Sequence, residues 1–186
     1  MSDKNRFEEL YNLSKNYLTN ELVKVLQFQE GLLLAKEMLN NDEWNEELQQ
    51  YAASLLNELR KKYSNEWNSK WNYDAFLGYA YDITLNYDER YKFYKSALER
   101  AGTPPPQLLV ALAGCCWAPG TPHITEEESI SLIKQALLEK PYYEAFSLLR
   151  GIYKSIGNTK EQAYCEDVLE NMKGKEIHLL PLDDVP

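Results

Sequence analysis

The residues of this chain best placed for acid–base chemistry are carboxylates that lie close to tyrosines in the sequence. Asp82, Asp88 and Glu89 are neighbours of Tyr79 and Tyr87. Paired carboxylates beside aromatic rings can hydrolyse a glycosidic bond, with one group acting as the acid and the other as the base or nucleophile. A chain of 186 residues is short for the deep cleft of a helical glycosidase. A small helical enzyme or ligand carrier therefore stays an alternative, and we assign no catalytic residue.

The histidines and cysteines do not form a recognisable metal or nucleophilic site. His123 and His178 are far apart and form no pair at helical metal-ligand spacing. Cys115 and Cys116 end an apolar segment, where a helix C-terminus would disfavour a thiolate. We expect them to be buried, and we expect no metal or cofactor. With Cys165 the cysteines number three, and this odd count without a disulfide pattern favours a reducing cytoplasm.

Motifs and charge favour a binding role over an enzymatic one. The sequence has no glycine-rich phosphate loop, nucleophile elbow or dinucleotide fingerprint. Its formal net charge of −9 disfavours nucleic acid and suits a basic protein partner. The first residues lack the apolar stretch of a signal peptide, and no apolar run reaches the roughly 18 residues that span a bilayer. We therefore expect a cytoplasmic protein without a membrane partner.

The elements that would position these residues are helices. Apolar residues recur at spacings of three and four nearly throughout, which predicts an all-α fold. Asp42 is the expected N-cap of the third helix, Thr125 and Glu128 form a capping-box pattern, and Gly174 is a helix stop. The spacing predicts helices over residues 3–18, 21–39, 43–63, 73–85, 88–101, 106–117, 126–139, 142–156 and 159–173.

Several positions recur at a spacing of 36 residues. The apolar series is Leu77, Ala113 and Leu149. The aromatic series lies one helical turn later in each unit and is Tyr81, Trp117 and Tyr153. Such a register is typical of stacked helical hairpins, in which a large aromatic residue fills the space between successive hairpins.

Within one unit, Leu77-Gly78, Tyr81, Tyr94 and Ala97-Leu98 resemble the spacing of a tetratricopeptide repeat (TPR). The segment 135–141, followed by Glu144-Ala145-Phe146, is similar to a junction between two such repeats. The likeness covers residues 73–173. Its period of 36 exceeds the usual value of about 34, and Arg90 and Ser129 stand where the family prefers alanine.

The resemblance implies antiparallel helical hairpins stacked as a right-handed superhelix. We expect a single domain with N-terminal helices in residues 1–72, three hairpins in 73–173 and an extended tail in 174–186. An unrelated helical bundle is the alternative. An uncapped end of such an array would favour a homodimer.

The resemblance also implies a concave binding groove lined by the first helix of each hairpin. We predict that a protein or peptide binds around Tyr79, Asp82, Arg150 and Lys154, and that the chain is a non-enzymatic binding module or scaffold. The basic clamp that some members use for C-terminal carboxylates is absent. The groove positions are Ala75, Tyr79, Asp82, Ala111, Cys115, Ala118, Ser147, Gly151 and Lys154, and their small size leaves room for an inserted segment, including the chain's own tail.

Two further interpretations stay open. Small size and a net charge of −9 fit an immunity-like or antitoxin-like protein that neutralises a basic toxin or nuclease. Residues 63–94 hold 11 of the 23 aromatic side chains, which favours core packing, with a recognition surface as the alternative. Packing explains Trp67, Trp71, Tyr79 and Tyr87 least.

Overall fold

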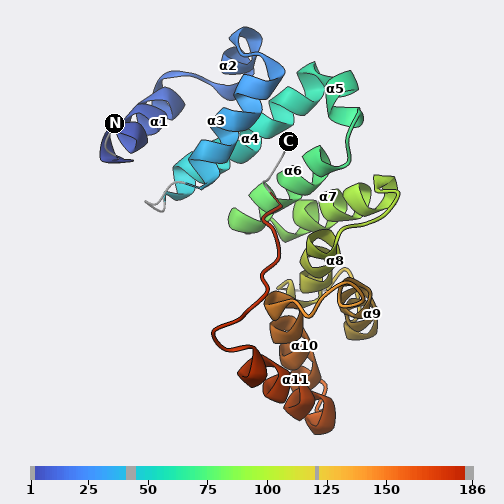
Figure 1. Ribbon diagram of the computed structural model, residues 1–186. Coiled ribbons are helices and arrows are strands. Elements are labelled where there is room, and N and C mark those ends of the chain that lie inside the picture. The colour runs from blue at the N-terminus through green and yellow to red at the C-terminus, as the bar shows by residue number, and fades with distance from the viewer. Residues whose placement is uncertain (1–2, 41–44, 120–121, 183–186) are drawn as a thin grey trace. The chain divides into compact units, whose positions relative to one another are not determined.

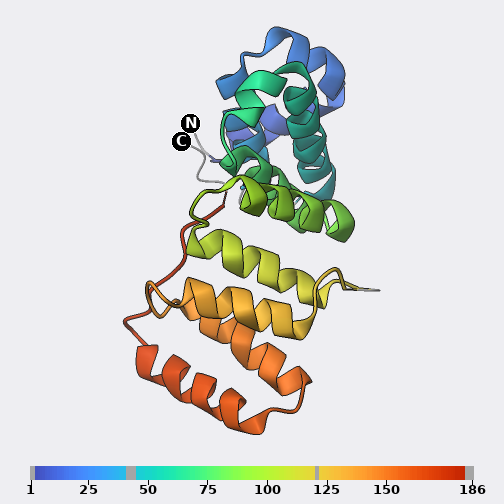
Figure 2. The same ribbon diagram turned by 90° about the vertical axis from the view of Figure 1, so that its right-hand side faces the viewer.

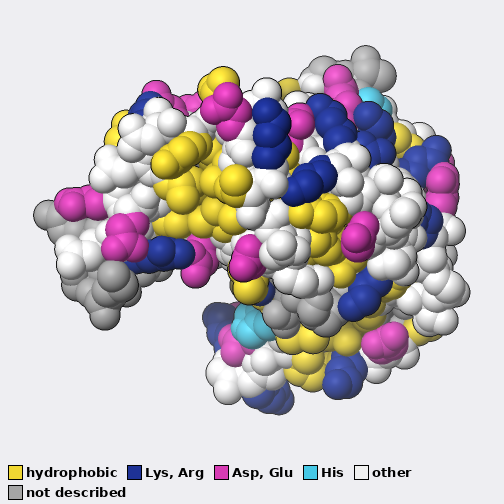
Figure 3. All heavy atoms as spheres, turned by 90° about the horizontal axis from the view of Figure 1, so that it is seen from above, with side chains coloured by type: hydrophobic (Ala, Val, Ile, Leu, Met, Phe, Trp, Pro, Cys, Tyr) yellow, Lys and Arg dark blue, Asp and Glu magenta, His cyan; other side chains and the backbone are white. Residues whose placement is uncertain are grey.

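The computed structural model describes residues 3–40, 45–119 and 122–182. Within these ranges the chain forms eleven α-helices and one 3-10 turn, and no β-strand (Figure 1). The predicted all-α class is confirmed. On the face shown in Figure 3, hydrophobic side chains lie among charged side chains of both signs.

The contacts divide the described chain into two compact units, with the boundary between Phe93 and Tyr94 inside helix α7 (Tyr87–Arg100). Each unit is therefore described by itself. The division does not decide whether residues 1–186 fold as a single domain, which stays a prediction.

The first unit is built around one long central helix, α4, which packs against α1, α2, α3 and α6. Its inward-facing residues Leu55, Leu56 and Leu59 are completely buried, because apolar residues at this spacing share one side of a helix. The helices of this unit before α7 are α1 (Asp3–Asn16), α2 (Thr19–Val25), α3 (Phe28–Leu39), α4 (Glu46–Lys62), α5 (Ser64–Asn68) and α6 (Asn72–Ile83).

The single helix predicted over residues 21–39 is wrong, because the chain breaks it into α2 and α3. Leu26 and Gln27 adopt extended backbone angles between the two helices. The backbone N–H of Gln27 donates to the Glu30 carboxylate at 2.9 Å, as in a capping box. Apolar spacing continues across the break and hides it, and glutamine is not among the preferred N-cap residues.

Other helix ends follow the expected local signals. The Thr125 hydroxyl accepts from Glu128 N–H at 3.2 Å, and Thr125 N–H donates to the Glu128 carboxylate at 2.8 Å, so this capping box is confirmed. Gly174 follows the last helix with a φ of +75°, as expected of a helix stop. Asp42 lies outside the described residues, and Asn45 caps α4 through a 2.9 Å bond from Leu48 N–H.

The aromatic block is mainly core. Trp67 is fully buried, and its indole N–H donates to the carboxylate of Asp74 at 2.7 Å. Phe28 and Tyr73 pack edge-on to one another at a ring-centroid distance of 5.1 Å, and both lie against Trp67. The expectation that packing would not explain Trp67 is therefore wrong.

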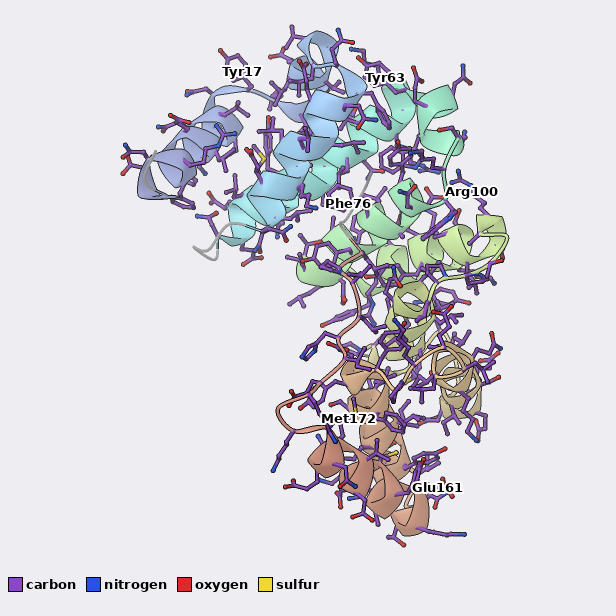
Figure 4. All side chains as sticks on the ribbon, viewed as in Figure 1. Tyr17, Tyr63, Phe76, Arg100, Glu161 and Met172 are labelled. Carbon is purple, nitrogen blue, oxygen red and sulfur yellow. The ribbon has the colours of Figure 1, made fainter. Side chains whose placement is uncertain are left out.

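In the second unit, successive helices pair. Helix α8 packs on α9 and α10 packs on α11, while α10 also contacts α8 and α9 (Figure 2). Whether these pairs are tetratricopeptide repeats stays a prediction. After the end of α7, the elements are α8 (Pro106–Ala113), the 3-10 turn η1 (Gly114–Trp117), α9 (Glu126–Ala136), α10 (Tyr143–Ser155) and α11 (Thr159–Met172). Figure 4 labels Glu161, near the start of α11, and Met172, its last residue.

The two departures from the family's alanine positions are accommodated by polar contacts. Ser129 is fully buried, and its hydroxyl donates to the carbonyl of Ala113 at 2.9 Å. Arg90 is also buried, and it forms an ion pair with Asp82. A buried polar group costs little stability when it is bonded in this way.

Candidate functional site

The four predicted binding residues are divided between the two units. Tyr79 and Asp82 lie on α6 in the first unit, whereas Arg150 and Lys154 lie on α10 in the second. Each pair is therefore considered in its own unit.

On α6, the polar groups of both residues are engaged within the first unit. The Tyr79 hydroxyl donates to the side-chain oxygen of Asn40 at 3.1 Å. Asp82 accepts from the Arg90 guanidinium at 2.6 Å, and this guanidinium lies over the ring of Tyr87, 5.1 Å from its centroid. These contacts tie α6 to the end of α3 and to α7, so both side chains have a structural role whether or not a partner touches them.

Two of the three carboxylates near these tyrosines form separate ion pairs. Asp82 pairs with Arg90, and Glu89 pairs with Lys92 at 3.0 Å. The geometry therefore gives the sugar-hydrolysis interpretation no support.

On α10, a row of residues shares one side of the helix. Tyr143, Ser147, Arg150, Gly151 and Lys154 stand at positions i, i+4, i+7, i+8 and i+11, so they form one stripe along the helix. Arg150 and Lys154 are both exposed to solvent. We call these five residues the α10 face.

Trp117, at the end of η1, lies across this face. A Cβ atom on Gly151 would come 2.3 Å from the Trp117 ring, so only glycine allows the indole to lie this close to α10. Even so, 50% of the Trp117 surface remains exposed. The contact holds a half-exposed indole over Gly151, and Arg150 and Lys154 lie one and three residues from this glycine on the same helix.

The sequence register did not reveal this exposure. It makes Trp117 equivalent to Tyr81 and Tyr153, which are 9% and 5% exposed. The glycine at position 151 was the available signal, because a residue without a side chain lets a large aromatic ring lie against the helix backbone.

The C-terminal tail docks at the beginning of α10. The carbonyl of Ile177 accepts from Tyr143 N–H at 2.9 Å. The carboxylate of Glu144 accepts from Leu179 N–H at 3.1 Å and lies 2.8 Å from His178 Nδ1. The His178 ring also contacts Tyr143, with the ring centroids 5.7 Å apart. The tail therefore reaches the Tyr143 end of the α10 face.

A cavity of about 270 Å³ lies among α9, α10 and α11. Its walls are mostly apolar and aromatic, with Lys134 and Glu161 as charged members. Cys165 also lines it, but burial raises the pKa of this thiol, and nearby Glu161 raises it further. A thiol in this state is protonated at neutral pH, so the cavity could hold a small apolar group but offers no activated nucleophile.

Cys115 and Cys116 are buried, as expected from the sequence. In the described part of the chain, no group of three or more His, Cys, Asp or Glu side chains could hold a metal ion. Along the described ranges, no helix combines the length and apolarity that a membrane crossing needs. No family model and no curated protein matches the sequence.

Proposed function

We propose that this protein is a non-enzymatic helical-repeat module that binds a protein or peptide. The observation that carries the proposal is the half-exposed Trp117, held over Gly151 beside two exposed cations. Tryptophan and arginine are the residues most often found to dominate binding energy at protein interfaces. An indole already fixed by packing loses little conformational freedom when a partner covers it.

The charge around Trp117 indicates the kind of partner segment. Arg150 and Lys154 are two exposed cations one helical turn apart, on a chain whose net charge is −9. A segment with an apolar side chain for the indole and a carboxylate for either cation would complement this surface. Tyr79 and Asp82, on α6 in the first unit, stay predicted binding residues.

The test compares partner capture by three versions of the full chain. The first is the wild type, and the second carries Arg150→Ala and Lys154→Ala on the α10 face. The third is a charge-matched control, Lys140→Ala with Lys160→Ala, whose side chains are also exposed but do not belong to this face. Each is used to capture proteins from a lysate of the source organism, and the captured proteins are quantified by mass spectrometry.

We expect a partner that the wild type and the control retain and the α10-face variant loses. Truncating an interface hot spot costs about 2 kcal/mol or more, which corresponds to roughly 30-fold in affinity. Equal capture by all three versions would show that the α10 face is not the binding site. Gly151→Ala gives a second check, because the added methyl group must displace the Trp117 ring without changing any charge.

The cavity lined by Lys134 and Phe146 favours a ligand carrier as a second candidate function. Its volume of about 270 Å³ falls just below the usual range of small-molecule sites. Native mass spectrometry of the purified protein checks this candidate, since a retained small molecule would support it.

A further inference from the structure

We propose that residues 177–182 are a built-in competitor for the peptide site, so that a partner must displace the tail to reach the α10 face. This inference rests on the proposed function and narrows it. The partner is then an extended peptide segment whose backbone binds at Tyr143 and Glu144.

The tail's own bonds indicate this binding mode. Tyr143 is the first residue of α10, and its N–H has no acceptor within the helix. The carbonyl of Ile177 supplies that acceptor, and Glu144 then receives the N–H of Leu179, two residues farther along the tail. One carbonyl and one N–H of an extended chain are thus recognised, and neither depends on the identity of a side chain.

The docking is weak enough to be reversible. Ile177 and Leu180 remain 38% and 66% exposed, and Leu179 and Leu182 are only partly buried, so much of the tail's apolar surface stays in water. Its hold on α10 consists mainly of bonds to Tyr143 and Glu144. The tail also follows directly from the helix stop at Gly174, so it can detach without unfolding α11.

The tail lies against one end of the α10 face, where it would compete with a partner for the proposed site. His178 lies against Tyr143, which belongs to the same face as Arg150, Gly151 and Lys154. From Tyr143 to Arg150 the helix rises by about 10 Å, which an extended peptide spans with about three residues. A partner segment lying along this face would therefore meet the tail at Tyr143. Because the tail is tethered, its effective local concentration is high, and it lowers the apparent affinity of any competitor.

The test uses a defined probe, a fluorescent peptide with the sequence of residues 175–182, and measures its binding to the full chain by fluorescence anisotropy. Leu179→Pro removes the N–H that donates to Glu144, which weakens the docking of the tail but leaves the docking site intact. Leu179→Ala is the matched control, because it shortens the same side chain and keeps the N–H. A double variant, Leu179→Pro with Glu144→Ala, removes the acceptor as well.

We expect the Leu179→Pro chain to bind the probe about ten-fold more tightly than the wild type or the Leu179→Ala chain, as for loss of one hydrogen bond to a charged group. The double variant should bind the probe no more tightly than the wild type does. Equal binding to the wild type and Leu179→Pro, or no binding to Leu179→Pro, would overturn the proposal. Hydrogen exchange gives an independent check, because the N–H group of Tyr143 should exchange faster in Leu179→Pro/Glu144→Ala than in the wild type.

These outcomes separate the two proposals. If the released site ignores the probe while partner capture still depends on Arg150 and Lys154, the competing tail is wrong and the binding function stands. If the probe binds as expected but no partner depends on those cations, the tail dock is real and the proposed function fails.

Discussion

Two tryptophans show how the surroundings of a residue decide its role. Trp67 is enclosed by aromatic rings and donates its indole N–H to Asp74, so it holds the first unit together. Trp117 lies on the backbone of Gly151 and keeps half of its surface in water. The same side chain is core in one place and a candidate contact in the other.

The bond between Trp67 and Asp74 predicts a loss of stability on substitution. Trp67→Phe keeps much of the aromatic packing but removes a donor to a carboxylate that is only 3% exposed. We expect the free energy of unfolding to fall by about 1–3 kcal/mol, because a buried acceptor loses a bond. Chemical denaturation measures this loss.

The control for this prediction is Trp71→Phe, which makes the same change at a half-buried site. A loss at Trp67 no greater than the loss at Trp71 would show that the bond to Asp74 contributes nothing beyond packing.

At the scale of the element, close helix approach depends on particular small residues. Gly31 on α3 is buried where α3 packs against α4, and a Cβ there would lie 2.6 Å from a methyl carbon of Leu59. Leu59 is itself completely buried, so it has little room to move aside. Gly151 plays the corresponding part beneath Trp117 in the second unit.

Gly31→Ala should therefore destabilise the protein in spite of alanine's higher helix propensity. Overpacking costs about 1–3 kcal/mol, while the gain in propensity offsets at most about 1 kcal/mol. Thermal unfolding should show a lower midpoint. Gly114→Ala is the contrasting change, because no atom beyond its chain neighbours and its own helix backbone lies within 4 Å of the added methyl group, and it should be neutral or slightly stabilising. A stabilised Gly31→Ala protein would mean that Leu59 repacks freely.

At the scale of the whole molecule, charge distinguishes specific binding from simple attraction. The net charge is −9, yet Arg150 and Lys154 on the α10 face are both exposed to solvent. General attraction to basic proteins, as the immunity-like alternative requires, acts through the net charge. Binding at the α10 face acts through contacts with an indole and two local cations.

Salt separates these modes. Raising the ionic strength from about 0.1 to 1 M shortens the screening length from about 10 to 3 Å. We expect capture of a partner bound at Trp117 to persist at the higher salt, because burial of apolar surface is not screened. If the wild type and the Lys140→Ala/Lys160→Ala control both lost the captured partner completely at intermediate salt, the result would favour the charge-driven alternative.

The sequence by itself determined the features that depend on a few neighbouring residues. Helical periodicity predicted the all-α class, the capping box at Thr125 and Glu128 was visible as a motif, and Gly174 stood out as a helix stop. These interactions lie within one turn of the chain, so their residue types carry the information. The break before α3 also has a local cause in Gln27 and Glu30, but its signal was weak and the apolar spacing ran through it.

Tertiary structure alone decided which side chains are available for binding. It buried Trp67, tied Asp82 to Arg90, left Trp117 half-exposed over Gly151, and brought the tail to Glu144. Trp117 and Gly151 are far apart in the sequence, and whether an indole is covered depends on how closely their two helices approach. Burial is a property of packed surfaces, so no spacing rule along one helix could have given it.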